Sequence, residues 1–261
     1  MNQVSVKGGH AMTTGAKTVL ILGSAPNVIE ARTLPKALFS AIVVINNAWR
    51  VRTDWDHHIS PDDFPEARKP PHLAPGQSSI GAADYVPANN HYGGVVYAGG
   101  TMAFSAGYWA LAALNPTALV FYGCDMVYPT TGRAHFYGTG TADPLRNDVT
   151  LRNLEAKSAR LMAHAAQQGC ACLRAPRGDS RLLFPTITLS GATMGIMATP
   201  HFDLDAFHRA KQREAELGYF VESGRYWTQA ASICPEKVDA LDQMWMQTTA
   251  ATPDGDAITR R

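Results

Sequence analysis

The stretch Thr18-Val-Leu-Ile-Leu-Gly-Ser-Ala-Pro-Asn27 decides the fold class of this chain. The apolar run that ends at Leu22 is typical of a strand buried on both faces of a parallel sheet. Gly23 and Ser24 follow at once, and we expect their backbone N–H groups to be uncovered. In α/β sheets, ligands bind in the crevice outside the carboxyl ends of the strands. The stretch therefore predicts a nucleotide-type ligand beside Gly23, Ser24 and Asn27.

Strand and helix patterns alternate after this stretch. Further strands are predicted at 41–46, 57–60, 117–122 and 170–175. Helices are predicted at 102–114 and 150–168, and a short helical stretch, broken by Pro35, at 27–38. Such alternation predicts an α/β fold, a Rossmann-like parallel sheet with helices on both faces. Helical patterns at 203–219 and 235–246 predict a C-terminal helical cap or an oligomerisation element. Residues 61–94 hold many Pro, Gly and Asn and are predicted to be a long irregular excursion.

Length and composition suit one large domain with an appendage. The chain has 261 residues, 46% of them apolar, and a net charge of +1, which gives no reason to expect a nucleic-acid partner. We expect a disordered N-terminus at 1–16, a Rossmann-like domain at 17–185, a helical extension at 186–248 and a disordered tail at 249–261.

The lack of a recognisable targeting signal and the spacing of the cysteines favour a cytoplasmic protein. Residues 1–17 lack the apolar core of a secretory signal, and no run of about 18 apolar residues could cross a membrane. Cys124, Cys170, Cys172 and Cys234 lack a paired metal-binding spacing, so we expect reduced and mostly buried thiols. Residues 194–220 and the aromatic pair Tyr226-Trp227 could supply a homo-oligomer interface.

Polar residues gather where the predicted strands end. Asn46-Asn47 follow the second strand, Ser60-Pro61-Asp62-Asp63 the third, and Asp125 and Tyr128 the fourth. Because the carboxyl ends of parallel strands share one edge, we expect these side chains to converge on one crevice. Each could instead form a turn or cap a helix.

Other motifs carry weaker signals. The first turn is neither a GxGxxG fingerprint nor a Walker loop, which argues against NAD and against ATP hydrolysis. Asp54-Trp55-Asp56 and Asp203-Leu204-Asp205 have the DxD spacing of some metal sites, but the second pair suits a helix start and we expect no metal site. His57-His58 suits a structural role. His135, in a Gly- and Thr-rich loop after the strongest strand, is the better catalytic candidate.

Taken in order, the strand ends resemble those of bacterial sialyltransferases of lipooligosaccharide synthesis. The resemblance is carried by Gly23–Asn27, by Ile45-Asn46-Asn47-Ala48-Trp49, by the helix start at Gly99-Gly100-Thr101, by Tyr122–Tyr128 and by His135-Phe136-Tyr137-Gly138. It covers roughly residues 18–185. It implies a metal-independent glycosyltransferase without a cofactor, which moves a sialic-acid-like sugar from a CMP-sugar donor to a glycan acceptor.

The resemblance also implies roles for single residues. Ser24 and Asn27 would contact the nucleotide phosphate or sugar, and Asn46 or Asn47 the ribose or phosphate. Thr101 would lie near the donor sugar. Tyr128 would donate a hydrogen bond to the departing phosphate, a form of electrostatic catalysis. Gly23 and Asp125 complete the predicted nucleotide-binding set, and Tyr128 and His135 are the predicted catalytic residues.

One departure from the family leaves the chemistry open. The family's base is a second His at the position of Thr139, and a threonine does not take a proton at neutral pH. Either His135 has taken the role, or the chemistry differs, or the protein only binds a nucleotide sugar. Ser60-Pro61-Asp62 also resembles pterin diphosphokinase-like proteins, in which Asp62, Asp63 and Asp125 could place Mg²⁺.

Overall fold

The fold is an α/β arrangement built on one parallel sheet, as the sequence predicts. The computed structural model describes residues 17–128, 132–138, 147–176, 178–189 and 202–249. Its six strands are β1 (Thr18–Leu22), β2 (Ala41–Ile45), β3 (His57–Ile59), β4 (Ser78–Ile80), β5 (Ala118–Tyr122) and β6 (Ala171–Ala175). They lie in the order β4-β3-β2-β1-β5-β6, and every neighbouring pair is parallel. The order reverses direction between β1 and β5, which is the topological switch point.

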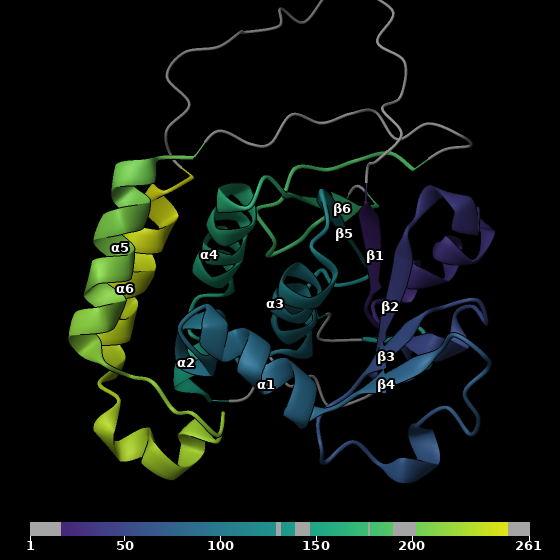
Figure 1. Cartoon of the computed structure of the whole chain (residues 1–261), viewed down its shortest axis with the longest axis horizontal. Coiled ribbons are helices and arrows are strands. Elements are labelled where there is room, and N and C mark those ends of the chain that lie inside the picture. Colours follow the sequence, from purple (N-terminus) through teal and green to yellow (C-terminus); the bar gives the residue numbers. More distant parts are fainter. Residues whose placement is uncertain (1–16, 129–131, 139–146, 177, 190–201, 250–261) are drawn as a thin grey trace, which may run out of the picture.

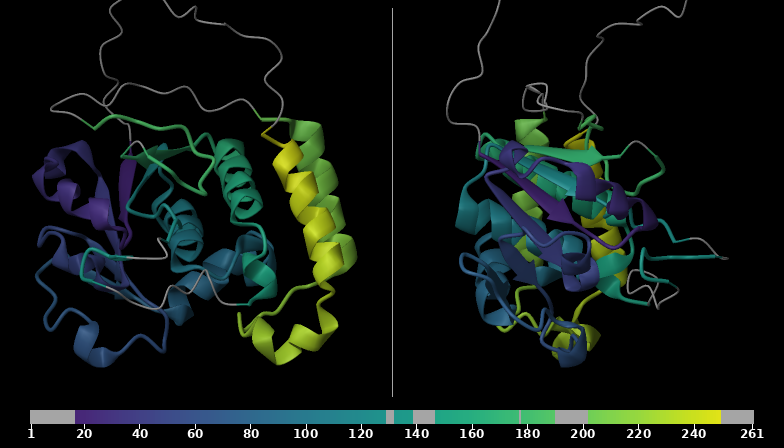
Figure 2. Two further views of the ribbon diagram at one scale, coloured as in Figure 1. Left: turned by 180° about the vertical axis from the view of Figure 1, so that it is seen from behind. Right: turned by 90° about the vertical axis from the view of Figure 1, so that its right-hand side faces the viewer.

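Both faces of the sheet are buried, which explains the unbroken apolar strands. On β1, Val19 and Ile21 belong to the core on one face, and Leu20 and Leu22 belong to the core on the other. The helices α1 (Ala82–His91), α3 (Met102–Leu114) and α4 (Leu154–Gln167) cover the first face (Figures 1 and 2).

Short 3₁₀ helices cover the second face. They are η1 (Pro26–Thr33), η2 (Lys36–Leu38) and η3 (Asn46–Arg50). Val28 and Ala31 of η1 are fully buried there, so even these short turns supply core. The predicted helix at 27–38 is thus two 3₁₀ helices, separated at Pro35, because proline disfavours a helical conformation in the residue before it.

The expectation of an irregular excursion at 61–94 is wrong. This segment contains η4 (Glu66–Arg68), the edge strand β4 and the helix α1, and α2 (Val95–Ala98) follows. Asp84 helps to start α1, because its carboxylate accepts a hydrogen bond from the Gly81 N–H at 2.9 Å. Pro87 lies inside α1 and made the segment look like a loop. Burial of Ala88 and Asn89 against the core outweighs the local cost of that proline.

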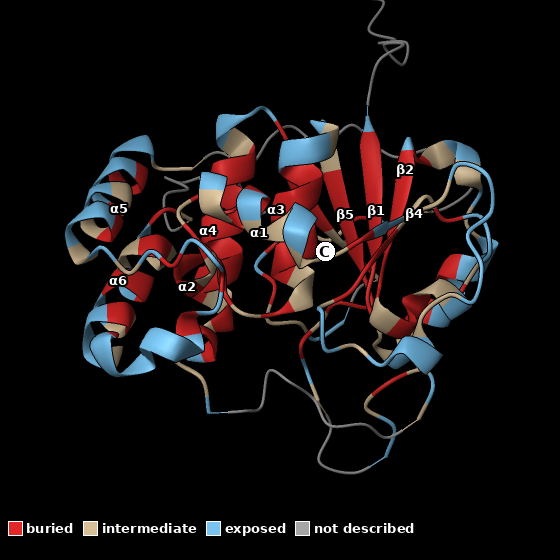
Figure 3. Ribbon diagram, turned by 60° about the horizontal axis from the view of Figure 1, so that its bottom comes forward, coloured by how far each residue is buried: buried red, intermediate tan, exposed pale blue. Residues whose placement is uncertain are grey.

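The C-terminal helices form a layer beyond α4, on its side remote from the sheet (Figure 1). They are α5 (Leu204–Leu217), η7 (Tyr226–Ser232) and α6 (Pro235–Gln247). Asp203 caps α5, since its carboxylate accepts the Ala206 N–H at 2.9 Å. Figure 3 shows the outer sides of α5 and α6 exposed and their inner sides buried. The predicted disordered segments 1–16 and 250–261 lie outside the described residues, and Thr249 itself follows α6.

Buried ion pairs join these helices to α4. Arg160 of α4 donates from Nε to Glu214 Oε1 at 2.6 Å, and the exposed fractions of the two residues are 0% and 3%. Lys157 Nζ donates to Asp242 Oδ1 of α6 at 2.7 Å. The cap is therefore joined to the sheet domain through a common interior. Among the described helices, none has the length and apolar character needed to span a bilayer.

Candidate functional site

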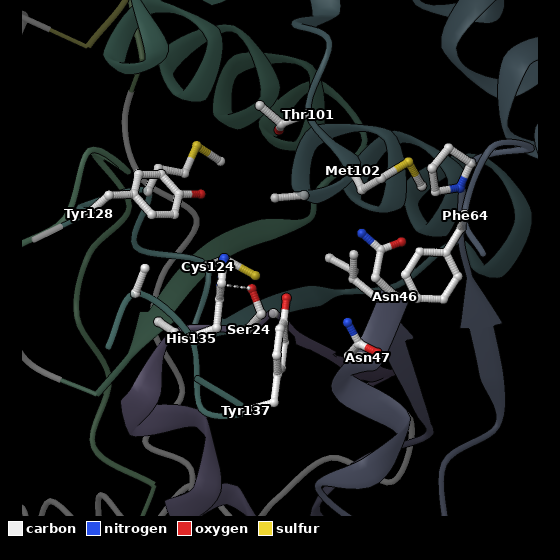
Figure 4. Close-up of a pocket in the computed structure, with 18 of the residues that line it drawn as sticks. Ser24, Asn46, Asn47, Phe64, Thr101, Met102, Cys124, Tyr128, His135 and Tyr137 are labelled. Atoms are coloured by element: carbon white, nitrogen blue, oxygen red, sulfur yellow. Dashed lines mark hydrogen bonds between the residues drawn. The ribbon is translucent and has the colours of Figure 1, made fainter. Parts of the chain in front are cut away.

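A cavity of about 290 Å³ opens at the carboxyl ends of the strands, around the switch point. Its lining comes from the turns after β1, β2 and β5, from the start of α3, from the segment 61–68 and from the loop 134–137 (Figure 4). The predicted site residues that line it are Gly23, Ser24, Asn46, Asn47, Thr101, Tyr128 and His135. Asn27 and Asp125 are not part of the lining.

Close packing of two turns forms the floor of the cavity. The Gly23 N–H donates to the Tyr122 carbonyl at 2.8 Å, and the Ala25 N–H donates to the Gly123 carbonyl at 2.9 Å. The expectation that the Gly23 amide is uncovered is therefore wrong, because strand pairing already uses it. A Cβ on Gly23 would lie 2.3 Å from the Gly123 carbonyl oxygen. Glycine is needed here for close approach of the two chains.

A serine and a histidine meet on one wall. Ser24 Oγ lies 2.9 Å from His135 Nδ1, and the Phe136 N–H donates to the Ser24 carbonyl at 2.9 Å. The His135 ring stacks on Tyr137, with centroids 4.9 Å apart and planes 9° apart. His135 is 6% exposed and Tyr137 41%, so the tyrosine covers the imidazole on the solvent side. Figure 4 shows Ser24, His135 and Tyr137 side by side at the cavity.

Two adjacent asparagines present unpaired acceptors on another wall. Asn46 and Asn47 follow β2, and their Oδ1 atoms are buried without a hydrogen-bond partner. Asn46 has a φ of 51°, the left-handed region that non-glycine residues seldom adopt. Buried His58 holds this conformation through a 2.9 Å contact from Nε2 to the Asn46 carbonyl. Burial lowers the pKa of His58, so the ring is neutral at pH 7. Because both residues line the cavity, a ligand or water there can supply the missing donors.

The N-terminus of α3 faces the same space. Thr101 caps the helix by accepting the Phe104 N–H, which leaves the first amides of α3 unused by the helix itself. Met102 and Ala103, which carry these amides, line the cavity. The helix dipole therefore gives this wall a partial positive charge suited to an anion. Arg68 is the one lysine or arginine among the described lining residues.

The turn after β5 is also under conformational strain. Met126 has a φ of 55° and is 7% exposed, and it lines the cavity with Tyr128. The Tyr128 ring contacts His135 edge-on, with centroids 6.1 Å apart. Burial and the nearby Asp125 carboxylate raise the pKa of Cys124, so its thiol is protonated and inert at pH 7. Strained backbone of this kind concentrates at functional sites.

Asn27 and Asp125 pair with each other instead of lining the cavity. Asn27 Nδ2 donates to Asp125 Oδ2 at 2.8 Å. Burial raises the pKa of Asp125, and the Asn27 hydrogen bond opposes that shift. The pair braces the β1 and β5 turns from outside the lining, so these residues support the wall on which ligand contact was expected.

The remaining acidic motifs are engaged elsewhere. Asp54 pairs with Arg52 at 2.6 Å, and Asp56 pairs with Lys36 and accepts the Ile42 N–H. Within the described ranges, no three His, Cys, Asp or Glu residues are grouped as metal ligands. His57 contacts Ser78 Oγ at 2.8 Å between β3 and β4, a structural contact outside the cavity. The four cysteines are free thiols, and Cys234 is the one that is partly exposed.

Sequence reasoning missed part of the lining. Phe64 and Arg68 line the cavity but belong to the segment that was expected to be an irregular excursion. Met102 and Tyr137 also line it, and the sequence predicted no role for either of them. An aromatic residue after the polar Ser60–Asp63 strand end was the available signal for Phe64. For Arg68 the sequence carries no local signal, because its position depends on the path of the chain between β3 and β4.

Comparison of the chain with protein-family models, with curated proteins and with solved structures finds no match. Thr139, where the sialyltransferase resemblance places a second His, lies outside the described residues.

Proposed function

We propose that the protein is a glycosyltransferase that uses a CMP-activated, sialic-acid-like sugar as donor and a glycan hydroxyl as acceptor. One observation carries this proposal: two buried acceptors without partners, on Asn46 and Asn47, share a cavity with the N-terminus of α3. The acceptors suit the hydroxyl groups of a sugar, and the helix N-terminus suits a phosphate. A sugar phosphate ester combines both groups in one molecule.

The lining can support the chemistry of transfer. The bond between the anomeric carbon and a phosphate oxygen breaks, and the acceptor oxygen forms the new bond to that carbon. The nucleoside monophosphate leaves with the bonding electrons, and the α3 N-terminus and the Tyr128 hydroxyl would stabilise its added charge. The acceptor hydroxyl loses its proton to His135. A positioned general base contributes about 10²- to 10⁴-fold in rate.

The diphosphokinase-like alternative has less support from the residues. That reaction would need carboxylates that hold Mg²⁺ beside the substrate. Of the three candidates, Asp63 lines the cavity, Asp62 accepts a long 3.4 Å contact from the Ala82 N–H, and Asp125 is paired with Asn27.

A nucleotide-protection experiment tests the proposal. CMP at about 100 times its Kd should stabilise the protein by about 2.7 kcal/mol, which raises the Tm of a chain of this size by roughly 5–11 °C. The experiment is run in EDTA, with AMP and GMP in parallel arms. No protection by CMP, or protection that requires Mg²⁺, would refute the proposal.

Activity is then measured as release of CMP from CMP-sialic acid in the presence of glycan acceptors. His135→Ala should abolish turnover while leaving CMP protection nearly intact, because the imidazole acts on the acceptor. Asn47→Ala should weaken CMP or donor binding by roughly tenfold through loss of a hydrogen bond. The control is His208→Ala, an exposed change on α5 far from the lining. If His208→Ala and His135→Ala behave alike, the assignment of the base is wrong.

A further inference from the structure

Arg68 is a cation in the cavity lining whose charge is not neutralised by any pairing within the described chain. The residue is exposed, and its guanidinium makes neither a hydrogen bond nor an ion pair with another described residue. Other basic side chains between β1 and β4 are held in ion pairs, which are Lys36–Asp56, Arg52–Asp54 and Lys69–Glu66. The Arg68 guanidinium is therefore available to an anionic group of a ligand.

The backbone contacts of Arg68 fix the wall from which its side chain starts. Trp49 Nε1 donates to the Arg68 carbonyl at 2.8 Å, a bond that does not use the guanidinium. It joins η4 to η3, the helix that begins at Asn46, so Arg68 reaches the cavity from the side of the asparagines. Figure 4 shows Phe64, which precedes η4, beside Asn46 and across the cavity from Tyr128.

The cavity thus has two cationic features, which belong to different elements. The N-terminus of α3 offers the backbone amides of Met102 and Ala103, which suit the phosphate of the proposed donor. Arg68 offers a planar fork of N–H donors, which matches the two oxygens of a carboxylate. The Asp63 carboxylate also lines the cavity and would repel an acidic ligand, a repulsion that a free guanidinium offsets. A phosphate at α3 leaves Arg68 for a second acidic group.

We propose that Arg68 is a specificity-determining residue that binds the carboxylate of an acidic sugar. The inference rests on the proposed function, and it names the protein group that separates an acidic sugar from a neutral one. The carboxylate has two sources in the proposed reaction, because the donor is a sialic-acid-like sugar and a glycan acceptor can itself end in such a sugar. A neutral sugar leaves the guanidinium without a partner and binds less tightly.

Binding measurements on Arg68 variants, made in EDTA, test the donor as the source. Calorimetry gives the Kd values of CMP and of CMP-sialic acid for the native protein, Arg68→Met and Arg68→Lys. Arg68→Met should raise the Kd of CMP-sialic acid by about tenfold and leave that of CMP unchanged, because an exposed charge-assisted pair contributes modestly. Arg68→Lys should lose less, since it keeps the charge and loses only the fork.

Kinetics tests the acceptor as the source. If the acceptor supplies the carboxylate, Arg68→Met should keep the donor Kd and raise KM by about tenfold for a glycan that ends in sialic acid. The KM of a glycan that ends in galactose should not change. Either pattern supports the proposal and assigns the source.

Arg50→Met is the matched control for the loss of a positive charge. Arg50 is exposed, its guanidinium lies 5.2 Å from the centre of the Trp49 ring, and it does not line the cavity. The variant removes the same charge from a neighbouring surface, so it should change neither the Kd values nor KM. Equal effects of Arg50→Met and Arg68→Met would show a general electrostatic effect and overturn the inference.

The other outcomes separate the inference from the proposed function. If CMP binds and Arg68→Met weakens CMP as much as CMP-sialic acid, the guanidinium binds the phosphate, and the inference is wrong while the proposed function stands. Unchanged Kd and KM values in Arg68→Met would have the same consequence.

Failure of CMP to bind the native protein would refute the proposed function, and the carboxylate site is then tested by itself. Free sialic acid and its uncharged methyl ester are compared on the native protein and on Arg68→Met by ligand-observed NMR. Binding of the acid but not of the ester, with loss of that binding in Arg68→Met, would support the site. Equal signals from acid and ester on the native protein would overturn it.

Discussion

Replacement of Glu214 by glutamine should be one of the most destabilising single changes outside the cavity. Glu214 Oε1 accepts from Arg160 Nε at 2.6 Å and from Trp245 Nε1 at 3.0 Å, and Oε2 accepts from Lys211 Nζ at 2.9 Å. Glutamine has nearly the same shape but no charge, so the Arg160 guanidinium would stay buried without its counter-ion. Removal of one partner from a buried ion pair costs about 3–5 kcal/mol, or roughly 6–20 °C in Tm for a chain of this size.

The assay is urea unfolding at pH 7, with the free energy of unfolding extrapolated to water. Glu216→Gln is the matched control on the same helix, because its pair with Arg213 is exposed and should contribute at most about 1 kcal/mol. A loss for Glu214→Gln no larger than that of Glu216→Gln would refute the reasoning. It would also show that the Arg160–Glu214 pair contributes little to holding α5 against α4.

The pH dependence of this difference follows from the pKa of Glu214. Burial opposes ionisation, yet the Arg160 charge outweighs it and holds the pKa below the usual value of 4.5. A carboxyl with a depressed pKa adds stability above its unfolded-state pKa and loses it as the pH falls through the folded-state value. The gap between the native protein and Glu214→Gln should therefore be constant near neutral pH and close only below about pH 4.5.

Four further predictions concern the cavity and its supports. Gly123→Ala should destabilise the fold by about 1–3 kcal/mol or more in thermal unfolding, because the new Cβ would lie 2.6 Å from Val28 Cβ at a φ of 67°. Asn46→Gly should keep the fold and weaken CMP binding in calorimetry, whereas Asn115→Gly, at an exposed left-handed position on the far end of α3, should not affect binding. Burial holds the pKa of His164 well below 6.5, so stability should fall as the pH drops below that value, by up to about 1.4 kcal/mol per unit from this residue, and His164→Leu should flatten the urea-unfolding profile there. Tyr226→Phe should weaken CMP binding modestly, because the Tyr226 hydroxyl donates to the Asp148 carboxylate. That carboxylate accepts from Thr150, whose hydroxyl oxygen accepts the Gly100 N–H just before Thr101. Equal Kd values for the native protein and Tyr226→Phe would exclude that connection.

The local sequence pattern predicted the structure well where one physical effect, the burial of apolar side chains, decides the conformation. The apolar runs of β1, β2 and β5 predicted buried parallel strands, because a strand that is covered on both faces needs no polar alternation. The pattern failed for α1, where Pro87 and nearby Asn residues indicated a loop. Packing of that segment against the core decides the conformation there, and packing is not visible in a local window.

The candidate site also has features that the sequence predicts and features that it does not. Convergence of Ser24, Asn46 and Tyr128 was predictable, because parallel strands place their carboxyl ends on one edge. The pairing of Asn27 with Asp125 was not, since side-chain direction at a strand end depends on the turn that follows. The contact between Ser24 and His135 spans 111 positions of sequence, so the chain offered no local sign of it.

The sequence by itself determined a buried first strand with a crevice at its end, from the stretch Thr18 to Asn27, and a parallel sheet, from the strand–helix alternation that follows it. Hydrophobic burial and strand geometry act over a few residues, so a local pattern reports them. Only the tertiary structure decided which polar groups face that crevice. It placed the Gly23 amide in strand pairing, left the Asn47 acceptor without a partner and brought His135 to Ser24. These outcomes depend on long-range packing, because the residues that the fold brings together decide which hydrogen bonds form.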